Sequence, residues 1–376
     1  MKILILHGSS DLYGASKILL VTVETFVKHG HQVTVILTES GPLAHLLQEA
    51  GAELLFVRLG ILRRKYKSLP GLLNRIWVMR KAYFQICKLI RNHNIDIVYS
   101  NTTAVLAGAF AARTTRTKHL WHIHEIIEQP AWLYRFLGRM LNHYSYGVIV
   151  VSEAVKKSWA RYVKEDKIHC IYNGIDYTPY LGSGSTLKQE LHLHPDTIVI
   201  GMIGRVHPWK GQAYFLDIAA RLNRRFSNLR FIMVGDAFPG NEYLYTELAA
   251  KINNLQLGSS ITDLGYRTDI PSLLQGFDIF VLPSVLPDPF PTVILEAMAS
   301  GKPVVATQHG GAIEMLTDKV TGIMIPVNEP ETAASRFEKL LADKAYREKI
   351  GQAARQKVLT HFSRTAFEEK ILKVLE

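Results

Sequence analysis

Short runs of β-branched and other apolar residues alternate with longer amphipathic segments along most of the chain. In the first half these runs predict strands at residues 3–6, 32–37, 97–100, 120–123 and 148–152. The rhythm lapses at residues 180–185 and resumes with predicted strands at 198–202, 230–234, 261–264, 279–282 and 303–306. Strands that alternate with helices form parallel βαβ units, so the pattern predicts two doubly wound α/β domains, residues 1–173 and 174–360. Ligands of such sheets bind beyond the carboxyl ends of the strands, and we expect the two domains to face each other across a cleft.

The composition indicates in which cellular compartment the protein is found. The 376 residues are 48% hydrophobic, which is enough to bury two sizeable cores. The best apolar stretch, residues 104–112, is about half of the roughly 20 residues that span a bilayer, and the run at residues 3–6 is too short for a signal peptide. Cys87 and Cys170 lack the spacing of a metal site and suit a reducing compartment. We therefore expect a cytoplasmic protein with no transmembrane segment.

The positive charge of the chain lies in its first half. Residues 1–173 hold 23 Lys and Arg against 11 Asp and Glu, whereas residues 174–376 hold 21 against 22. Residues 58–91 contain no acidic side chain at all. Such asymmetry favours an anionic partner, whether phospholipid, lipid pyrophosphate or nucleic acid, although solubility alone is the simpler explanation.

The basic segment predicts an amphipathic helix from Leu72 to Arg91. One stripe is expected to pack on the sheet, formed by Leu72, Ile76, Met79, Tyr83, Ile86 and Ile90. The opposite band mixes large apolar groups with cations: Leu73, Trp77, Arg80, Lys81, Phe84, Lys88 and Arg91. This combination is typical of a helix that lies on an anionic membrane surface. The alternative is that the aromatic side chains pack on a neighbouring helix or subunit.

Two loops in the second half carry candidate chemistry. After the predicted strand 198–202, Gly204 permits close backbone approach, and Arg205 and Lys210 can reach a diphosphate, although such cations are often simply solvated. After the strand 279–282, a proline-rich loop precedes a helix that is expected to start near Thr292. The amides of its first turn suit a phosphate, and Glu296 is placed to accept hydrogen bonds from ribose hydroxyls. A glutamate near a helix N-terminus is also routine.

The ordered set of motifs resembles glycosyltransferase family 4. Asp288 and Glu296 stand eight positions apart and are followed by the residues Ala-Met-Ala-Ser-Gly-Lys-Pro-Val-Val-Ala and by Gly310-Gly311. The resemblance extends over essentially the whole chain through Tyr13-Gly14-Ala15-Ser16, Asn173-Gly174-Ile175-Asp176, Gly204-Arg205, Lys210-Gly211, Val234-Gly235-Asp236, Glu314 and Thr321-Gly322. It implies the GT-B fold, with an acceptor-side domain at residues 1–173, a nucleotide-sugar domain at 174–360 and a final helix at 361–376 that crosses back to the first domain.

The resemblance assigns site residues one by one. It makes Arg205 and Lys210 ligands of the donor diphosphate, Glu296 the ribose ligand and Asp288 a contact of the transferred sugar. The expected donor-binding set is completed by Gly14, Ala15, Gly204, Tyr266, Arg267, Phe290, Thr292 and Val293. The loop 264–267 matches the segment whose backbone pairs with the base, although it is equally a simple turn. The family usually has glutamate at position 288 and often glycine at 291, where this chain has Asp288 and Pro291.

The strand that ends near Ile123 supplies the first-half candidate. Alternation along a strand places His122 and His124 on one face, with Ile123 on the other. The resemblance makes His124 a contact of the donor sugar; the alternative is a histidine with a purely structural role. The expected catalytic set is therefore His124, Arg205, Lys210 and Asp288. Gly14 and Ala15 correspond to the small-residue loop beneath the donor phosphate, where the lack of a Cβ at Gly14 allows close approach.

The reaction that the resemblance implies is sugar transfer with retention. Negative charge builds on the departing diphosphate, and Arg205, Lys210 and the helix N-terminus at Thr292 neutralise it electrostatically. We expect no cofactor and no metal, because no Asp-x-Asp follows a strand and no His or Cys cluster has ligand spacing. No nucleophile is assigned, since the leaving phosphate itself can take the acceptor's proton. The expected partners are a nucleotide-sugar donor and a glycan or lipid-linked acceptor at the inner face of the membrane, not nucleic acid.

Other classes of protein share this frame. A dehydrogenase is disfavoured, because the first βα turn, Gly8 to Gly14, lacks the Gly-x-Gly-x-x-Gly spacing. A nucleotide-sugar epimerase or a phosphorylase fits two such domains, but an epimerase does not explain a basic acceptor half. A subunit that binds a nucleotide sugar without transferring it also stays open, because Asp288 and Pro291 depart from the family pattern.

Overall fold

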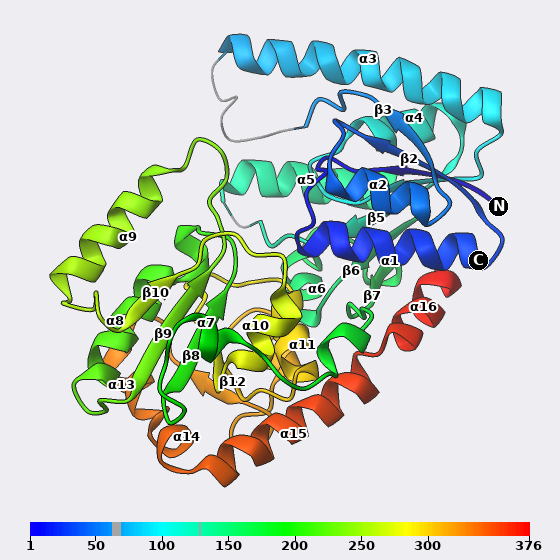
Figure 1. The fold of residues 1–376 in the computed structure, drawn as a ribbon. Helices are drawn as coiled ribbons and strands as arrows, with labels where there is room; N and C mark the ends of the chain where they lie inside the picture. The colour runs from blue at the N-terminus through cyan, green and yellow to red at the C-terminus, as the bar shows by residue number, and fades with distance from the viewer. Residues whose placement is uncertain (62–68, 128) are drawn as a thin grey trace. The chain divides into compact units, whose positions relative to one another are not determined.

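The computed structural model describes residues 1–61, 69–127 and 129–376, without the side chains of residues 69, 70, 72 and 73. The chain divides into two compact units (Figure 1). Unit 1 comprises Met1–Ile175 together with Arg364–Glu376, and unit 2 comprises Asp176–Ser363. The first crossing between the units therefore lies two residues beyond the sequence-based boundary after Asn173.

Unit 1 is built on a parallel sheet of seven described strands in the order β3-β2-β1-β4-β5-β6-β7. Its strands are β1 Lys2–Leu6, β2 Gln32–Leu37, β3 Glu53–Phe56, β4 Ile97–Ser100, β5 Lys118–Ile123, β6 Gly147–Val150 and β7 Ile168–Cys170. The strand order reverses between β1 and β4, which are paired with Ile3 opposite Ile97. The side chains of β1 beyond Lys2 and all those of β4 are buried, as expected for strands covered on both faces.

Helices cover both faces of this sheet (Figure 1). The helices α1 (Gly14–Lys28) and α2 (Pro42–Glu49) pack together, while α3 (Leu69–His93) packs on α4 (Ala107–Thr115), which in turn contacts α5 (Ala131–Tyr144). The close fit of α4 depends on its small residues. A Cβ on Gly108 would lie 2.3 Å from Leu6 Cδ1 and 2.8 Å from Ser100 Oγ, so only glycine allows the helix to approach the sheet this closely.

The long helix α3 confirms part of the amphipathic pattern. Ile86 and Ile90 are buried, Met79 and Tyr83 are half-buried, and the Tyr83 hydroxyl lies 3.0 Å from Thr114 Oγ1 of α4. The expectation for Ile76 is wrong, since this side chain is 54% exposed and Val78, Ala82 and Cys87 are buried instead. Heptad-like spacing cannot reveal where along a helix its packing partners begin. Arg63, Arg64, Lys65 and Lys67, and the side chains of Leu72 and Leu73, lie outside the described residues.

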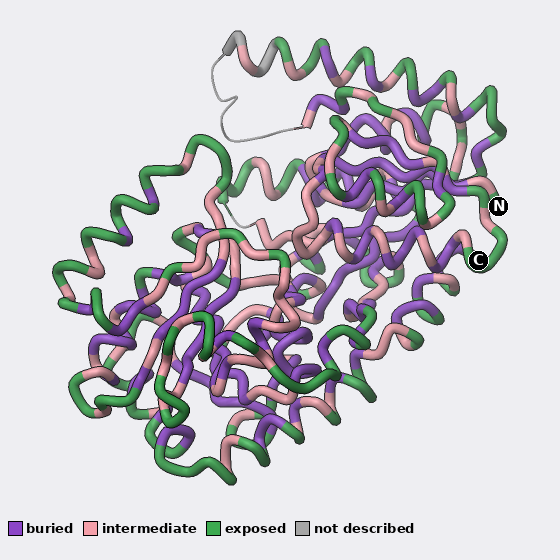
Figure 2. Tube along the Cα trace, viewed as in Figure 1, coloured by how far each residue is buried: buried purple, intermediate pink, exposed green. Residues whose placement is uncertain are grey.

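Unit 2 repeats the architecture with six described strands in the order β10-β9-β8-β11-β12-β13. These are β8 Ile198–Ile203, β9 Leu229–Val234, β10 Ile261–Asp263, β11 Ile279–Leu282, β12 Val304–Thr307 and β13 Ile323–Ile325, all paired in parallel. The order reverses between β8 and β11. Figure 2 shows the buried strands at the centre of the unit. The predicted pair of Rossmann-like parallel-sheet domains is thus confirmed.

The helices of unit 2 include α8 (Gln212–Asn223) and α9 (Tyr243–Asn254), which pack on each other, and α11 (Thr292–Ala299), which packs on α15 (Lys344–His361). Two glycines make the last contact possible. A Cβ on Gly351 of α15 would lie 2.0 Å from the Gly301 carbonyl oxygen, just after α11. The remaining described helices of this unit are α7 (Leu187–Glu190), α10 (Ile270–Gly276), α12 (Ala312–Met315), α13 (Pro330–Ser335) and α14 (Glu338–Ala342).

The last helix, α16 (Arg364–Lys373), belongs to unit 1 and packs on α1. Phe367 and Ile371 are fully buried there. Arg364 ties the two helices together, since its guanidinium lies 2.9 Å from Glu24 of α1 and 2.7 Å from Glu368 of its own helix. Over the described part of the chain, no helix is long and apolar enough to cross a membrane.

Candidate functional site

In unit 2 most of the candidate residues lie where the strand order reverses, at the carboxyl ends of β8 and β11. The chain leaves β8 through Gly204 and Arg205, makes a short 3-10 turn at Pro208–Lys210 and enters α8. Gly211 has φ +81°, and a Cβ on it would lie 1.9 Å from the Pro283 carbonyl oxygen after β11. The loop is thus locked against its neighbour, with the Val285 amide donating to the Trp209 carbonyl at 2.8 Å. A reversal point of this kind is where doubly wound sheets bind ligands.

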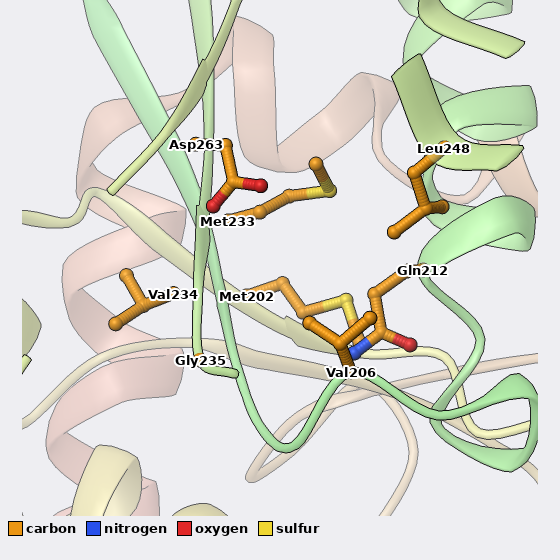
Figure 3. A pocket seen from close by; sticks show the side chains of 8 residues that line it. All are labelled: Met202, Val206, Gln212, Met233, Val234, Gly235, Leu248 and Asp263. Atoms are coloured by element: carbon orange, nitrogen blue, oxygen red, sulfur yellow. The ribbon is translucent and has the colours of Figure 1, made fainter. Parts of the chain in front are cut away.

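Arg205 is held in a defined orientation. Its guanidinium carbon lies 3.3 Å from the centre of the Phe238 ring, in the loop that follows β9. Its backbone carbonyl accepts a hydrogen bond of 2.8 Å from Gln212 Nε2. Figure 3 shows Gln212 beside a small, largely apolar cavity beneath this loop, with room for about one water molecule, lined by Met202, Val206, Gln212, Met233, Val234, Gly235, Leu248 and Asp263. This cavity is too small for a nucleotide.

Lys210 and Asp288 form an ion pair in the structure. Both side chains are largely buried, at 29% and 16% exposure. The backbone of Asp288 is fixed by the two glycines of the family motif. The Gly311 amide donates to the Asp288 carbonyl at 2.8 Å. Gly310 adopts φ +58°, and a Cβ on this residue would clash with the same carbonyl oxygen. These contacts explain why Gly310-Gly311 accompanies the acidic residue in the sequence pattern.

The loop that contains Asp288 leads into α11. Pro291 is the N-cap residue, with φ −69°, and its carbonyl accepts from the Ile294 amide at 3.0 Å. The missing N–H of proline therefore removes no bond from the helix. As the first helical residues, Thr292 and Val293 present amides that the helix cannot pair internally, which suits an anion. Phe290 is buried against Phe362, with ring centres 5.5 Å apart, so its side chain braces the loop.

Glu296 lies one turn further along α11 and is 2% exposed. It contacts Tyr180, and burial together with the Glu296 carboxylate raises the pKa of the Tyr180 hydroxyl. The Tyr180 carbonyl in turn accepts from Gln275 Nε2 at 2.9 Å. Sequence reasoning did not find Tyr180, because nothing in the spacing along the chain links it to Glu296.

The candidate base-binding loop follows β10. Gly265 has φ +60°, and its carbonyl accepts a hydrogen bond of 2.8 Å from the Gly235 amide. Tyr266 is 58% exposed. The Arg267 guanidinium bonds Asp269 at 2.7 Å and Glu190 at 2.6 Å, and these hydrogen bonds raise its pKa. The side chain of Arg267 is therefore committed to carboxylates, whereas Lys210, Asp288 and the start of α11 come together.

Unit 1 has a buried polar cluster at its own reversal point, beyond β1 and β4. His124, which follows β5, places Nε2 3.1 Å from Asn101 Oδ1. The Asn101 amide nitrogen lies 3.2 Å from His7 Nδ1, and His7 Nε2 lies 3.1 Å from Ser16 Oγ. Burial lowers the pKa of His7 to about 4 and that of His124 well below its usual value. Both imidazoles are therefore neutral at pH 7.

The pair His122 and His124 confirms the predicted alternation, with ring centres 4.1 Å apart. His122 is fully buried and its Nδ1 lies 2.7 Å from the Tyr99 hydroxyl, so this histidine belongs to the core. The neighbouring Glu125 carboxylate accepts from the Thr102 hydroxyl and from the His124 amide at 3.2 Å. Burial nevertheless raises the pKa of Glu125.

Gly14 and Ala15 form the start of α1, after the extended N-cap residue Tyr13. The Ala15 carbonyl accepts from the Asn101 amide nitrogen at 3.3 Å. Asn101 was not among the sequence candidates, although it directly follows a predicted strand. Within the described residues, no group of three or more His, Cys, Asp or Glu side chains is arranged to hold a metal ion.

Two family models match the chain. The model for glycosyl transferases group 1 covers residues 184–357, and that for Glycosyltransferase Family 4 covers residues 13–178. Among curated relatives, the chain is 25% identical over 350 residues to the UDP-Gal:alpha-D-GlcNAc-diphosphoundecaprenol alpha-1,3-galactosyltransferase of Escherichia coli, covering 89% of this chain and 86% of the relative. It is 28% identical to the N,N'-diacetylbacillosaminyl-diphospho-undecaprenol alpha-1,3-N-acetylgalactosaminyltransferase of Campylobacter jejuni, over 76% and 78% of the two chains.

The solved structures agree with these matches. The crystal structure of Anabaena Alr3699/HepE in complex with UDP and glucose superposes with a TM-score of 0.87 at 27% identity, over 100% of this chain and 99% of that one. The two family models together account for most of both units, and two of the motifs on which the resemblance rested, Tyr13-Gly14-Ala15-Ser16 and Gly204-Arg205, follow the strands β1 and β8 that flank the reversal points. The chain therefore belongs to glycosyltransferase family 4 and has the GT-B fold.

Proposed function

We propose that this glycosyltransferase moves a sugar from a UDP-sugar to a lipid-linked glycan acceptor, with retention of the anomeric configuration. The donor class is supported by relatives, since one acts with UDP-Gal and another protein of this fold was crystallised with UDP and glucose. The acceptor class is supported by relatives whose names specify diphosphoundecaprenol-linked sugars. These two relatives match over three quarters or more of both chains.

The proposal rests on one observation: Lys210 forms an ion pair with Asp288, which lies just before the N-terminus of α11. A cation and a helix N-terminus thus stand together at the reversal point of the sheet, which is an arrangement suited to a diphosphate. We propose that the donor diphosphate replaces Asp288 as the partner of Lys210. Asp288, once released, is then available to accept a hydrogen bond from a hydroxyl of the sugar.

The chemistry follows from this charge arrangement. The bond between the anomeric carbon and the phosphate oxygen breaks, and a bond forms from that carbon to the acceptor hydroxyl oxygen. Arg205, Lys210 and the amides of Thr292 and Val293 stabilise the charge that develops on the departing diphosphate. The acceptor's proton passes to the leaving phosphate, so no enzymatic base and no metal ion are needed in the proposal.

The remaining contacts complete the donor site. Glu296 accepts from the ribose hydroxyls, and the backbone of Tyr266 and Arg267 pairs with the base, because the Arg267 side chain is already bound to carboxylates. From unit 1, His124 contacts a hydroxyl of the transferred sugar, and the Gly14-Ala15 turn accommodates the phosphate.

Helix α3 supports a membrane location for the acceptor. Trp77 and Phe84 are 57% and 58% exposed, and Arg80, Lys81, Lys88 and Arg91 are exposed as well. Lys81 Nζ lies 3.6 Å from the Trp77 ring centre. We propose that this surface contacts anionic lipid at the cytoplasmic face of a membrane, where a lipid-linked acceptor resides.

The deciding experiment offers the protein UDP-, GDP-, ADP- and dTDP-sugars with a polyprenyl diphosphate-linked sugar acceptor, in buffer with EDTA. We expect transfer from a UDP-sugar, an unchanged anomeric configuration by NMR of the product, and no loss of rate with EDTA. Loss of rate that Mg²⁺ or Mn²⁺ restores contradicts the metal-independent mechanism. Binding of a UDP-sugar without hydrolysis or transfer supports the non-catalytic alternative, and a donor recovered as its epimer supports the epimerase.

A further inference from the structure

Asn101 occupies a central place in the buried cluster of unit 1. It is the first residue after β4 and is fully buried. Its backbone N–H donates to the Leu6 carbonyl at 3.0 Å, at the reversal point of the sheet. Its side chain contacts three different groups: His124 Nε2 at 3.1 Å, His7 Nδ1 at 3.2 Å and the Ala15 carbonyl at 3.3 Å. One side chain thus connects the strand-end histidine with the turn that starts α1.

The Ala15 carbonyl decides which way the Asn101 amide points. A carbonyl oxygen only accepts, so the atom that faces it must be the amide nitrogen of Asn101. The reverse orientation would set two oxygens 3.3 Å apart in a buried site. The amide oxygen of Asn101 therefore faces His124 Nε2, and the nitrogen also donates to His7 Nδ1.

This orientation sets the tautomers of both histidines. Because the Asn101 oxygen accepts, His124 carries its proton on Nε2, which leaves Nδ1 with a lone pair. Because the Asn101 nitrogen donates, His7 is unprotonated at Nδ1 and carries its proton on Nε2, directed at Ser16 Oγ 3.1 Å away. The lowered pKa values of both groups agree with neutral rings. The hydrogen bonds run in one direction, from His124 through Asn101 and His7 to Ser16.

We propose that Asn101 is a positioning residue that holds His124 as the Nε2–H tautomer, so that Nδ1 accepts a hydrogen bond from a hydroxyl of the donor sugar. The same side chain fixes the Ala15 carbonyl and with it the turn at Gly14-Ala15. The sugar contact rests on the proposed function, whereas the hold on the tautomer does not. The proposal makes the site selective for a group that donates, because a neutral ring in this tautomer cannot donate from Nδ1.

The tautomer is measured directly by long-range ¹H–¹⁵N correlation on protein labelled with ¹⁵N-histidine, without donor and at pH 7.5. We expect His124, assigned with a His124→Gln variant, to show a protonated Nε2 and an unprotonated Nδ1. In Asn101→Leu, which removes every side-chain bond, the two nitrogen shifts of His124 should move toward each other as both tautomers become populated. In Asn101→Asp, which still accepts from His124 but cannot donate, the His124 pattern should persist while His7 changes to the Nδ1–H form.

The matched control is Asn142→Leu, which removes another asparagine of unit 1, one whose Oδ1 accepts from the Lys164 amide at 3.0 Å. It should leave the His124 signals unchanged. Transfer kinetics provide the second measurement: kcat/KM should fall about tenfold or more in Asn101→Leu and much less in Asn101→Asp, and adding Asn101→Leu to His124→Ala should cost little more, as expected for coupled groups.

An Nδ1–H form of His124 in the wild type, or a His124 tautomer that does not respond to Asn101→Leu, overturns the proposal. If Asn101→Leu does not fold, the His7 change in Asn101→Asp still tests the amide orientation, and an unchanged His7 overturns it. If the tautomers behave as expected but His124→Ala retains full activity, the sugar contact in the proposed function is refuted while the hold of Asn101 on His124 is supported.

Discussion

The guanidinium carbon of Arg205 lies 3.3 Å from the centre of the Phe238 ring, and this contact joins the loops that follow β8 and β9. The aromatic face attracts the cation and also restricts the rotamers of a long side chain that otherwise samples many. Phe238 thus orients the residue that we propose as a diphosphate ligand.

Phe238→Leu should therefore lower kcat/KM by about tenfold, the equivalent of roughly 1.4 kcal/mol and within the range of a partly desolvated cation–π contact. The loss should be small beside that of Arg205→Ala. Initial-rate kinetics with a saturating acceptor check it, with Tyr243→Leu, an exposed aromatic residue at the start of α9, as the control. Equal rates in Phe238→Leu and wild type would mean that the stacking is incidental.

Lys210→Ala and Arg205→Ala should each reduce turnover by about 10²-fold or more, the scale seen when a group that stabilises transition-state charge is lost. Neither substitution removes the fold's main core, so the melting temperature should change little. Lys344→Ala serves as the control, because Lys344 is 80% exposed and pairs with Glu348 along its helix. Near wild-type turnover in both variants would remove the two cations from the diphosphate site.

Glu296→Ala should mainly weaken donor binding, because a ribose contact is made about equally in the ground state and the transition state. Calorimetric titration with UDP and with a UDP-sugar measures the effect, which should be the same for both ligands. Tyr180→Phe provides the comparison, since it removes the hydroxyl beside Glu296 and keeps the ring. An unchanged Kd for UDP in Glu296→Ala places that carboxylate outside the ribose site.

Acid should destabilise unit 1 through its buried neutral histidines. Burial lowers the pKa of His119 and His122 to about 3 and that of His7 to about 4, against 6.5 for an exposed imidazole. The unfolded chain therefore binds protons that the folded unit does not, and stability is lost as the pH falls from about 6.5 toward 4. Each such group contributes on the order of 1–2 kcal/mol to the loss between pH 7 and 5.

His119 is the cleanest of the three to test, because it lies outside the candidate site. Its ring bonds Ser100 Oγ at 3.0 Å and the Tyr144 carbonyl at 3.2 Å. In His119→Gln the difference between the unfolding midpoints at pH 7 and pH 5, followed by urea titration, should be smaller than in wild type. The solvent-exposed His45→Gln is the control. An identical pH dependence in His119→Gln and wild type would contradict the role of burial.

The surface of α3 predicts binding to anionic vesicles. Wild type should sediment with vesicles that contain phosphatidylglycerol at low salt and not with purely zwitterionic ones, because each basic residue near the surface contributes about 1 kcal/mol. A variant with Trp77→Ala, Arg80→Glu, Lys81→Glu and Lys88→Glu should remain in the supernatant. A variant of equal charge change in unit 2, Lys319→Glu, Lys344→Glu and Lys349→Glu, should still bind. Equal sedimentation of the two variants excludes α3 as the membrane surface.

The strands were predictable wherever β-branched residues cluster, as in β2 and β11. The edge strands β3 and β13 were not predicted: β3, Glu53–Phe56, contains no β-branched residue, and β13, Ile323–Ile325, is only 3 residues long. Periodicity identified the faces of α3, but not how far along the helix other elements pack against it. For this reason Ile76 was assigned to the core. Burial depends on what lies opposite a residue, and that information is not local.

The sequence likewise predicted only some of the residues of the candidate site. Motif spacing identified Arg205, Lys210 and Glu296, whose roles stay predictions, together with the glycines whose conformations the structure explains. It did not reveal Phe238, Tyr180 or Asn101, because each lies in a different segment of the chain from its partner. No spacing along the chain records that the Asp288 carboxylate pairs with Lys210.

The return of α16 to unit 1 makes that unit discontinuous in sequence, with Met1–Ile175 separated from Arg364–Glu376 by all of unit 2. During translation, the surface of α1 around Glu24 therefore stays uncovered until the ribosome has passed residue 363. Unit 2 is one continuous segment and can complete its sheet before that moment. The order in which the two units are completed thus differs from the order in which they begin to emerge from the ribosome. Unit 1 is the first to emerge and the last to be completed.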